Sequence, residues 1–107
     1  MTSWAYIYEH PGADPQADRT VLDRAGQRSY MVPVADPADA PDAARRLVEE
    51  DRVALIELCG GFSLADAARV ADAVGDRVPV GHVTFAADSV ESAAAYSAAY
   101  AEEQGDG

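Results

Sequence analysis

One stretch, Val53 to Phe62 with the sequence VALIELCGGF, constrains the fold more than any other part of the chain. Its apolar run is typical of a parallel strand covered on both faces, although a short run of this kind also fits a buried helix. The pair Gly60-Gly61 permits a sharp turn, and Ser63 with Asp66 forms a capping-box pattern at a helix start. The stretch therefore predicts a buried strand, a glycine turn and a helix, in that order.

A carboxylate lies within this predicted strand. Alternation along a strand groups Glu57 with Val53, Leu55 and Cys59 on one face, near the C-terminal end. An ionised carboxylate among apolar neighbours is costly unless it is paired or hydrogen-bonded. Glu57 is therefore the strongest single candidate for a functional group.

The rest of the chain alternates between strand and helix patterns. Residues 20–34 fit either a hairpin or a loop followed by one strand. The predicted elements are strands over 4–9, 30–34, 53–58 and 79–85, and helices over 36–51, 64–74 and 88–102. The residues expected to face the core from the middle helix are Leu64, Ala67, Ala68, Ala71 and Val74.

This order of elements predicts one α/β domain over residues 1–103. It has about four mostly parallel strands in a single layer, flanked by three helices that form βαβ crossovers. Residues 104–107 are expected to be a frayed tail. In so small a domain, an uncovered sheet face or an alanine-rich helix face is available as a contact in a homodimer.

Charge narrows the range of partners. The 107 residues carry 19 acids against 8 bases, every base is an arginine, and the formal net charge is −11. Such a surface repels phosphate backbones and anionic lipid surfaces, so neither nucleic acid nor a membrane is an expected partner. The amino terminus lacks the pattern of a signal peptide, and no apolar run approaches the roughly 20 residues that span a bilayer. A cytoplasmic location is expected.

The predicted fold brings the candidate residues to one edge, because open α/β sheets bind ligands outside the carboxyl ends of their strands. The candidates for catalysis are Glu57, His10, His82 and Cys59. The candidates for ligand binding are Glu9, Gly60, Gly61, Phe62, Ser63 and Thr84. The N–H groups that follow the glycine turn, at a helix N-terminus, are expected to hold a carboxylate, an enolate oxygen or a phosphate.

Each catalytic candidate also has a structural interpretation. Glu57 is either a general base or acid, or a structural carboxylate, with the two weighed about equally. If His82 shares the face of Glu57, a Glu–His hydrogen bond across adjacent strands is feasible, but a core or interface histidine is the commoner case. Cys59 is a possible nucleophile, although a lone cysteine at a strand end more often behaves as a small hydrophobe. His10 is accessible, but exposed histidines before proline are ordinary.

No metal or cofactor site is expected. The two histidines and the single cysteine show no ligand spacing of the CxxC or HxxxH kind. A single cysteine also excludes an intramolecular disulfide.

Three segments resemble a known family. These are YIYEHPGADP at residues 6–15, LIELCGGF at residues 55–62 and VPVG at residues 78–81. They are similar to a family of small single-domain bacterial proteins classed as a domain of unknown function, and the likeness covers nearly the whole chain. The resemblance implies a stand-alone domain and assigns no role to any residue. His82 and the segment 19–28 depart from the family pattern.

Two functions are expected from the sequence. The first is a small cofactor-independent enzyme of isomerase or lyase type, or an enzyme-like binding protein, that acts on a small polar or anionic organic molecule. In it Glu57 moves a proton and the glycine turn holds an anion. The second is a non-catalytic homo-oligomeric module for ligand binding or protein interaction, with Trp4, Tyr6 and Tyr8 on the partner surface.

Overall fold

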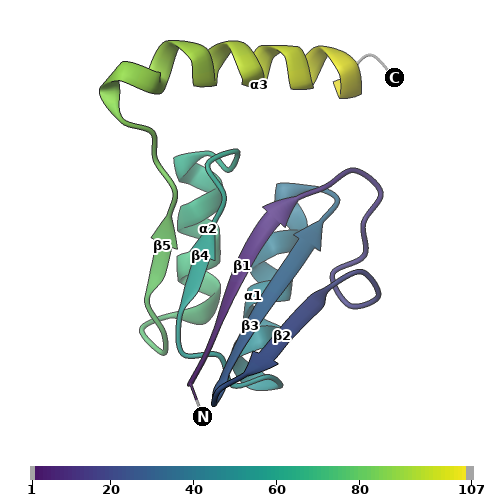
Figure 1. Cartoon of the computed structure of the whole chain (residues 1–107), viewed down its shortest axis with the longest axis vertical. Coiled ribbons are helices and arrows are strands. Elements are labelled where there is room, and N and C mark those ends of the chain that lie inside the picture. Colours follow the sequence, from purple (N-terminus) through teal and green to yellow (C-terminus); the bar gives the residue numbers. More distant parts are fainter. Residues whose placement is uncertain (1, 106–107) are drawn as a thin grey trace.

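The computed structural model describes residues 2–105, which form one mixed sheet and three α-helices (Figure 1). The strands are β1 (Thr2–Glu9), β2 (Thr20–Arg24), β3 (Gln27–Val34), β4 (Ile56–Leu58) and β5 (Val80–His82). The helices are α1 (Ala40–Glu49), α2 (Leu64–Val74) and α3 (Val90–Gly105), and one-turn 3₁₀ helices at Pro37–Asp39 and Ala87–Ser89 precede α1 and α3.

The strands lie side by side in the order β2-β3-β1-β4-β5. Strands β3, β1, β4 and β5 are parallel, and only β2 is antiparallel. The predicted α/β fold is thus confirmed, with one strand more than expected because residues 20–34 form a hairpin. Its two-residue turn uses Ala25 at φ 55° and Gly26 at φ 81°, the pair of positive φ angles that a tight hairpin turn needs.

Both sheet-covering helices lie on the same face of the sheet (Figure 1). Helix α1 connects β3 to β4 and α2 connects β4 to β5, so both crossovers step in the same direction across the sheet. Because such crossovers are right-handed, they place their helices on one side. The core between these layers contains Ala5, Ile7, Tyr30, Val32, Val34, Ala40, Ala44, Leu47, Ile56, Leu58, Phe62, Val70 and Val74.

Within residues 2–105, no helix covers the opposite face of the sheet, since the connection from β1 to β3 consists of a loop and the edge strand β2. A right-handed helical crossover from β1 to β3 would have placed a helix on this face. We call it the open face. The strand register assigns to it Trp4, Tyr6 and Tyr8 of β1, Leu22 of β2, Met31 of β3 and Glu57 of β4. Most of these side chains are large and apolar or aromatic, and they are half-buried or exposed.

The central stretch is covered on one face only, so the prediction of a strand buried on both faces was wrong. Ile56 and Leu58 are fully buried beneath the helices, whereas Glu57 between them is exposed on the open face. The strand is also shorter than predicted. Before it, the chain still pairs with β1, because Ala54 N donates to the Ser3 carbonyl oxygen at 2.9 Å and Ala5 N donates to that of Leu55 at 3.0 Å.

Helix α2 has the predicted ends but a different buried row. The Ser63 hydroxyl accepts from Asp66 N at 3.0 Å, and the Asp66 carboxylate accepts from Ser63 N at 3.3 Å, which completes the capping box. The sheet-facing residues are Val70 and Val74, with Ala67 packed beside them, while Leu64 is 80% exposed. The helix is therefore rotated about its axis relative to the predicted stripe.

Gly75 ends α2 in a backbone conformation that is essentially restricted to glycine, with φ 63° and ψ −142°. A Cβ at this position would meet no atom within 4 Å, so a substitution changes only the backbone energy. We expect Gly75→Ala to lower the free energy of unfolding by about 1–3 kcal/mol, measured by urea denaturation. Gly105→Ala also projects into open space, without a positive φ, and serves as the control with a change below about 0.5 kcal/mol. Equal effects in both variants would refute the backbone explanation.

Helix α3 lies across the carboxyl end of the sheet rather than on either face (Figure 1). None of its described residues is buried. The tail predicted for residues 104–107 is helical through Gly105, and its last two residues lie outside the described part of the chain. Within residues 2–105, none of the helices combines the length and apolar character needed to cross a membrane.

Candidate functional site at the carboxyl edge

The order of the parallel strands creates a topological switch point between β1 and β4. From β1 the chain passes to β3 on one side, and it returns as β4 on the other. Connections that diverge in this way leave a crevice at the carboxyl ends of the two strands, where open α/β sheets bind ligands. A cavity of about 420 Å³ lies there, between the ends of β1 and β4 and helix α3.

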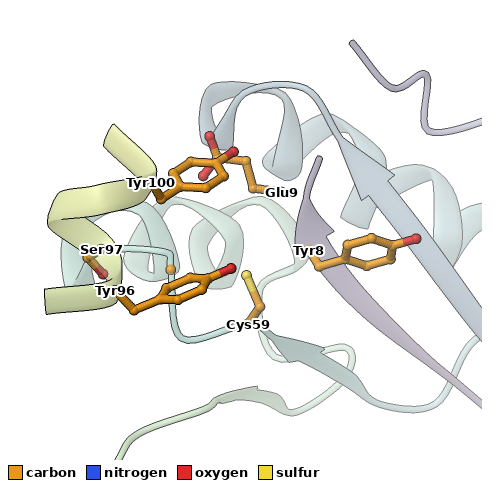
Figure 2. A pocket seen from close by; sticks show the side chains of 7 residues that line it. Tyr8, Glu9, Cys59, Tyr96, Ser97 and Tyr100 are labelled. Atoms are coloured by element: carbon orange, nitrogen blue, oxygen red, sulfur yellow. The ribbon is translucent and has the colours of Figure 1, made fainter. Parts of the chain in front are cut away.

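Three segments line this carboxyl-edge cavity (Figure 2). Tyr8 and Glu9 end β1, and Cys59 and Gly61 belong to the turn after β4. Helix α3 contributes Tyr96, Ser97 and Tyr100, and Tyr100 lies on the same side of the helix as the other two because it is four residues from Tyr96 and three from Ser97. Figure 2 shows the Tyr96 ring extending from α3 toward Cys59 and the Tyr100 ring extending toward Glu9.

The charges around the cavity are negative. Burial raises the pKa of Glu9, and the carboxylates of Asp36 and Asp66 raise it further. Burial also raises the pKa of Tyr100, and the Glu9 carboxylate adds to this effect. Both shifts indicate a partly desolvated site in which additional negative charge is disfavoured.

Two backbone N–H groups before α2 already have hydrogen-bond partners within the chain. The carboxylate of Asp66 accepts from Ser63 N, and Phe62 N donates to the Cys59 carbonyl oxygen at 3.2 Å. These are N–H groups that the sequence analysis assigned to an anionic ligand. Phe62 itself is 2% exposed and packs in the core, and Ser63 serves as the helix cap.

Glu57 and His82 lie on opposite faces of the sheet. Glu57 pairs with Gly81 across β4 and β5, and His82 pairs with Leu58, whose side chain faces the helices. The condition for a Glu–His hydrogen bond, a shared face, is therefore not met. His82 Nε2 instead lies 2.8 Å from the Phe62 carbonyl oxygen and donates to it. This bond ties β5 to the turn before α2.

The remaining candidates lie outside the carboxyl-edge cavity. The His10 ring is exposed, and its Nδ1 is 3.2 Å from the Pro11 carbonyl oxygen. Thr84 is exposed beyond the end of β5. Gly60 lines an adjoining hollow with Gly61 and Phe85. Among residues 2–105, no group of three or more His, Cys, Asp or Glu is arranged to hold a metal ion.

The contribution of α3 to the cavity was not expected from the sequence. Tyr96 and Tyr100 are the only aromatic residues in an alanine-rich helix, and their four-residue spacing is the signal that they share a face. That spacing predicts a common surface but not the edge of the sheet against which the surface lies.

Comparison with known proteins identifies the family. Residues 2–98 match DUF6506, a family of unknown function. The chain belongs to this family. The resemblance to a domain of unknown function is thereby confirmed, and DUF6506 membership extends over the sheet, both covering helices and the tyrosine of α3 at position 96. No curated protein and no solved structure matches the chain.

Proposed function

We propose that this chain binds a small organic molecule in the carboxyl-edge cavity and transfers a proton without a cofactor, as an isomerase or lyase does. The observation that carries the proposal is a carboxylate with a raised pKa, Glu9, lining a cavity at the topological switch point. General acid–base groups work best when their pKa approaches the operating pH, and the surroundings of Glu9 shift its pKa in that direction.

In this proposal Glu9 takes the role that the sequence analysis gave to Glu57, which is exposed on the open face. The Glu9 carboxylate accepts a proton from one atom of the substrate and becomes a carboxylic acid. It then returns the proton to a different atom, so no oxidant or reductant is needed. The Tyr100 hydroxyl donates a hydrogen bond to the substrate oxygen on which negative charge develops.

Binding and proton transfer are tested together by NMR in D₂O. A screen of small molecules should give hits that shift the backbone signals of Gly61, Ser97 and Tyr100. For a true substrate, deuterium should replace hydrogen at the carbon that Glu9 deprotonates, and Glu9→Gln should slow this exchange by about 100-fold or more. Glu57→Gln is the matched control and should exchange at the wild-type rate. Hits that map to the open face instead would refute the proposed site.

The titration of Glu9 gives a prediction that needs no ligand. Because its pKa is raised in the folded state, the native protein binds more protons than the unfolded chain just above pH 4.5. Stability contributed by Glu9 therefore falls as the pH rises through this window. Glu9→Gln should stabilise the protein at pH 7, by no more than about 1 kcal/mol because Glu9 is only half-buried, and the gain should vanish at about pH 3.

Carboxyl ¹³C NMR measures this shift directly. The Glu9 midpoint should lie above 4.5, whereas that of Asp14 should lie below 3.8, because backbone N–H groups of Ala17 and Gln16 donate to its carboxylate. Asp14 thus provides a control of opposite sign in the same spectrum. A Glu9 midpoint at or below 4.5 would remove the electrostatic basis of the proposal.

A second candidate function, a homo-oligomeric interaction module, is favoured by the open face. Aromatic side chains of β1 lie at its centre, and the Tyr6 and Tyr8 rings stack with their centroids 6.1 Å apart. Five strands about 4.8 Å apart, two of them about 26 Å long and three of them shorter, form a face of roughly 400 Å², about half of the roughly 800 Å² per partner of a standard interface. We propose a second copy of this chain as the occupant. For either function we propose a cytoplasmic location. We propose neither nucleic acid nor a membrane as a partner.

A further inference from the structure

We infer that the carboxyl-edge cavity selects a small organic cation, such as a quaternary ammonium or a protonated amine, rather than the anionic ligand that the sequence suggests. The inference rests on the proposed function, because it names the class of molecule that the proposed cavity holds. Three independent features of the described residues lead to it: the residues that line the cavity, the charges behind them and the state of the nearby helix N-terminus.

The lining combines one carboxylate with tyrosine rings. Glu9 of β1 and Tyr100 of α3 both line the cavity, and Tyr96 extends from the same helix as Tyr100 (Figure 2). None of the described lining residues is basic. Aromatic faces and a carboxylate together attract an organic cation, because the ring quadrupole and the charge both favour positive charge. An anion would meet the Glu9 charge with no compensating cation.

The charges behind the lining act in the same direction. Asp36 and Asp66 both lie close enough to Glu9 to act on its charge. Arg69 Nη1 donates to the Asp66 carboxylate at 2.9 Å and partly offsets that charge, but Arg69 is exposed on α2 and does not line the cavity. The net charge of −11 adds a long-range attraction for cations.

The helix N-terminus does not reverse this preference. A free N-terminus attracts anions, but here the Asp66 carboxylate accepts from Ser63 N and already supplies a negative charge at the first turn of α2. The glycine turn therefore contributes space and backbone to the cavity wall. A ligand carboxylate or phosphate would have to displace the Asp66 carboxylate from this helix N-terminus.

Three isosteric probes test the inference: choline, its neutral carbon analogue 3,3-dimethyl-1-butanol, and the anion 3,3-dimethylbutanoate. Binding is followed by NMR shifts of Gly61, Ser97 and Tyr100 in the full chain. We expect choline to bind at least about tenfold more tightly than the neutral analogue, because only choline gains a cation–π contact with a tyrosine ring and the attraction of the Glu9 carboxylate. The anion should give no shifts. A higher salt concentration should weaken the binding of choline and leave the binding of the neutral analogue unchanged.

Variants identify the groups responsible. Glu9→Gln should weaken choline binding about tenfold and leave the affinity for the neutral analogue unchanged. Tyr100→Phe keeps the ring and should retain choline binding, whereas Tyr100→Leu should lose it. Glu57→Gln, outside the cavity, should match the wild type. Equal or tighter binding of the neutral or anionic probe at the cavity would overturn the cation class and leave the proposed site standing.

The remaining outcomes separate the two proposals. If choline gives no shifts while other small molecules shift the cavity signals, the cation inference fails and the proposed function survives. If no compound of any charge shifts these signals, both fail.

Discussion

Replacing Leu58 with alanine should lower the free energy of unfolding by about 2–5 kcal/mol. The Leu58 side chain is fully buried at the centre of the layer between the sheet and the helices, beside Ile7 in the paired strand. Truncation removes buried apolar surface and leaves a cavity that the surrounding strands cannot fill. Because a domain of this size is stable by only about 5–15 kcal/mol, the variant should be close to unfolding at physiological temperature.

Leu64→Ala is the matched control for this prediction. It is the same substitution at a side chain that is 80% exposed, so the expected change stays within about 0.5 kcal/mol. Both variants should be compared by urea denaturation, with unchanged m-values showing that the unfolded state is the same. A cost at Leu64 similar to that at Leu58 would mean that α2 packs through the row containing Leu64 and not through Val70 and Val74.

Replacing Tyr6 with alanine should raise the dissociation constant of the proposed homodimer by roughly 30- to 1000-fold, which corresponds to about 2–4 kcal/mol. Tyr6 occupies the middle strand of the open face, paired with Met31 on one side and Glu57 on the other. Burial beneath a second copy would desolvate it more fully than residues at the rim. Because each copy carries a charge of −11, added salt should strengthen the wild-type dimer.

Tyr96→Ala provides a control of the same residue type. Tyr96 is 74% exposed on α3 and is not one of the sheet residues that form the open face, so its loss should leave the dissociation constant unchanged. Sedimentation equilibrium measures both variants, and circular dichroism checks that Tyr6→Ala keeps its fold. A wild-type protein that remains monomeric at all accessible concentrations would refute the homodimer.

Features set by local sequence were predictable. The ends of α2 follow from Ser63, Asp66 and Gly75, which act within one turn of the helix. The hairpin at residues 20–34 stayed ambiguous because its turn is Ala25-Gly26, whereas the strongest hairpin signals are Asn-Gly and Asp-Gly. The buried row of α2 depends on how the helix is rotated against the sheet, and alanines on several sides left that rotation open.

The location of the candidate site could be predicted from the sequence, but not all of the residues that line it. The carboxyl-edge rule grouped Glu9, Cys59 and Gly61 as site candidates, and these three residues line one cavity. Glu57 was the first candidate because its strand was expected to be covered on both faces. Whether the second face is covered depends on whether the β1-to-β3 connection contains a helix. The tyrosines of α3 were missed because no local pattern tells where a helix without buried residues lies.

The position of β1 in the sheet has a consequence for synthesis of the chain. The first strand to leave the ribosome is the central one, and Ala5 finds its two partners only at Tyr30 and Ile56. This central strand must therefore wait, with its aromatic and aliphatic side chains unpaired, until Ile56 has been made. Contacts this distant in sequence slow folding, so the nascent protein is most exposed to aggregation before Leu58 emerges.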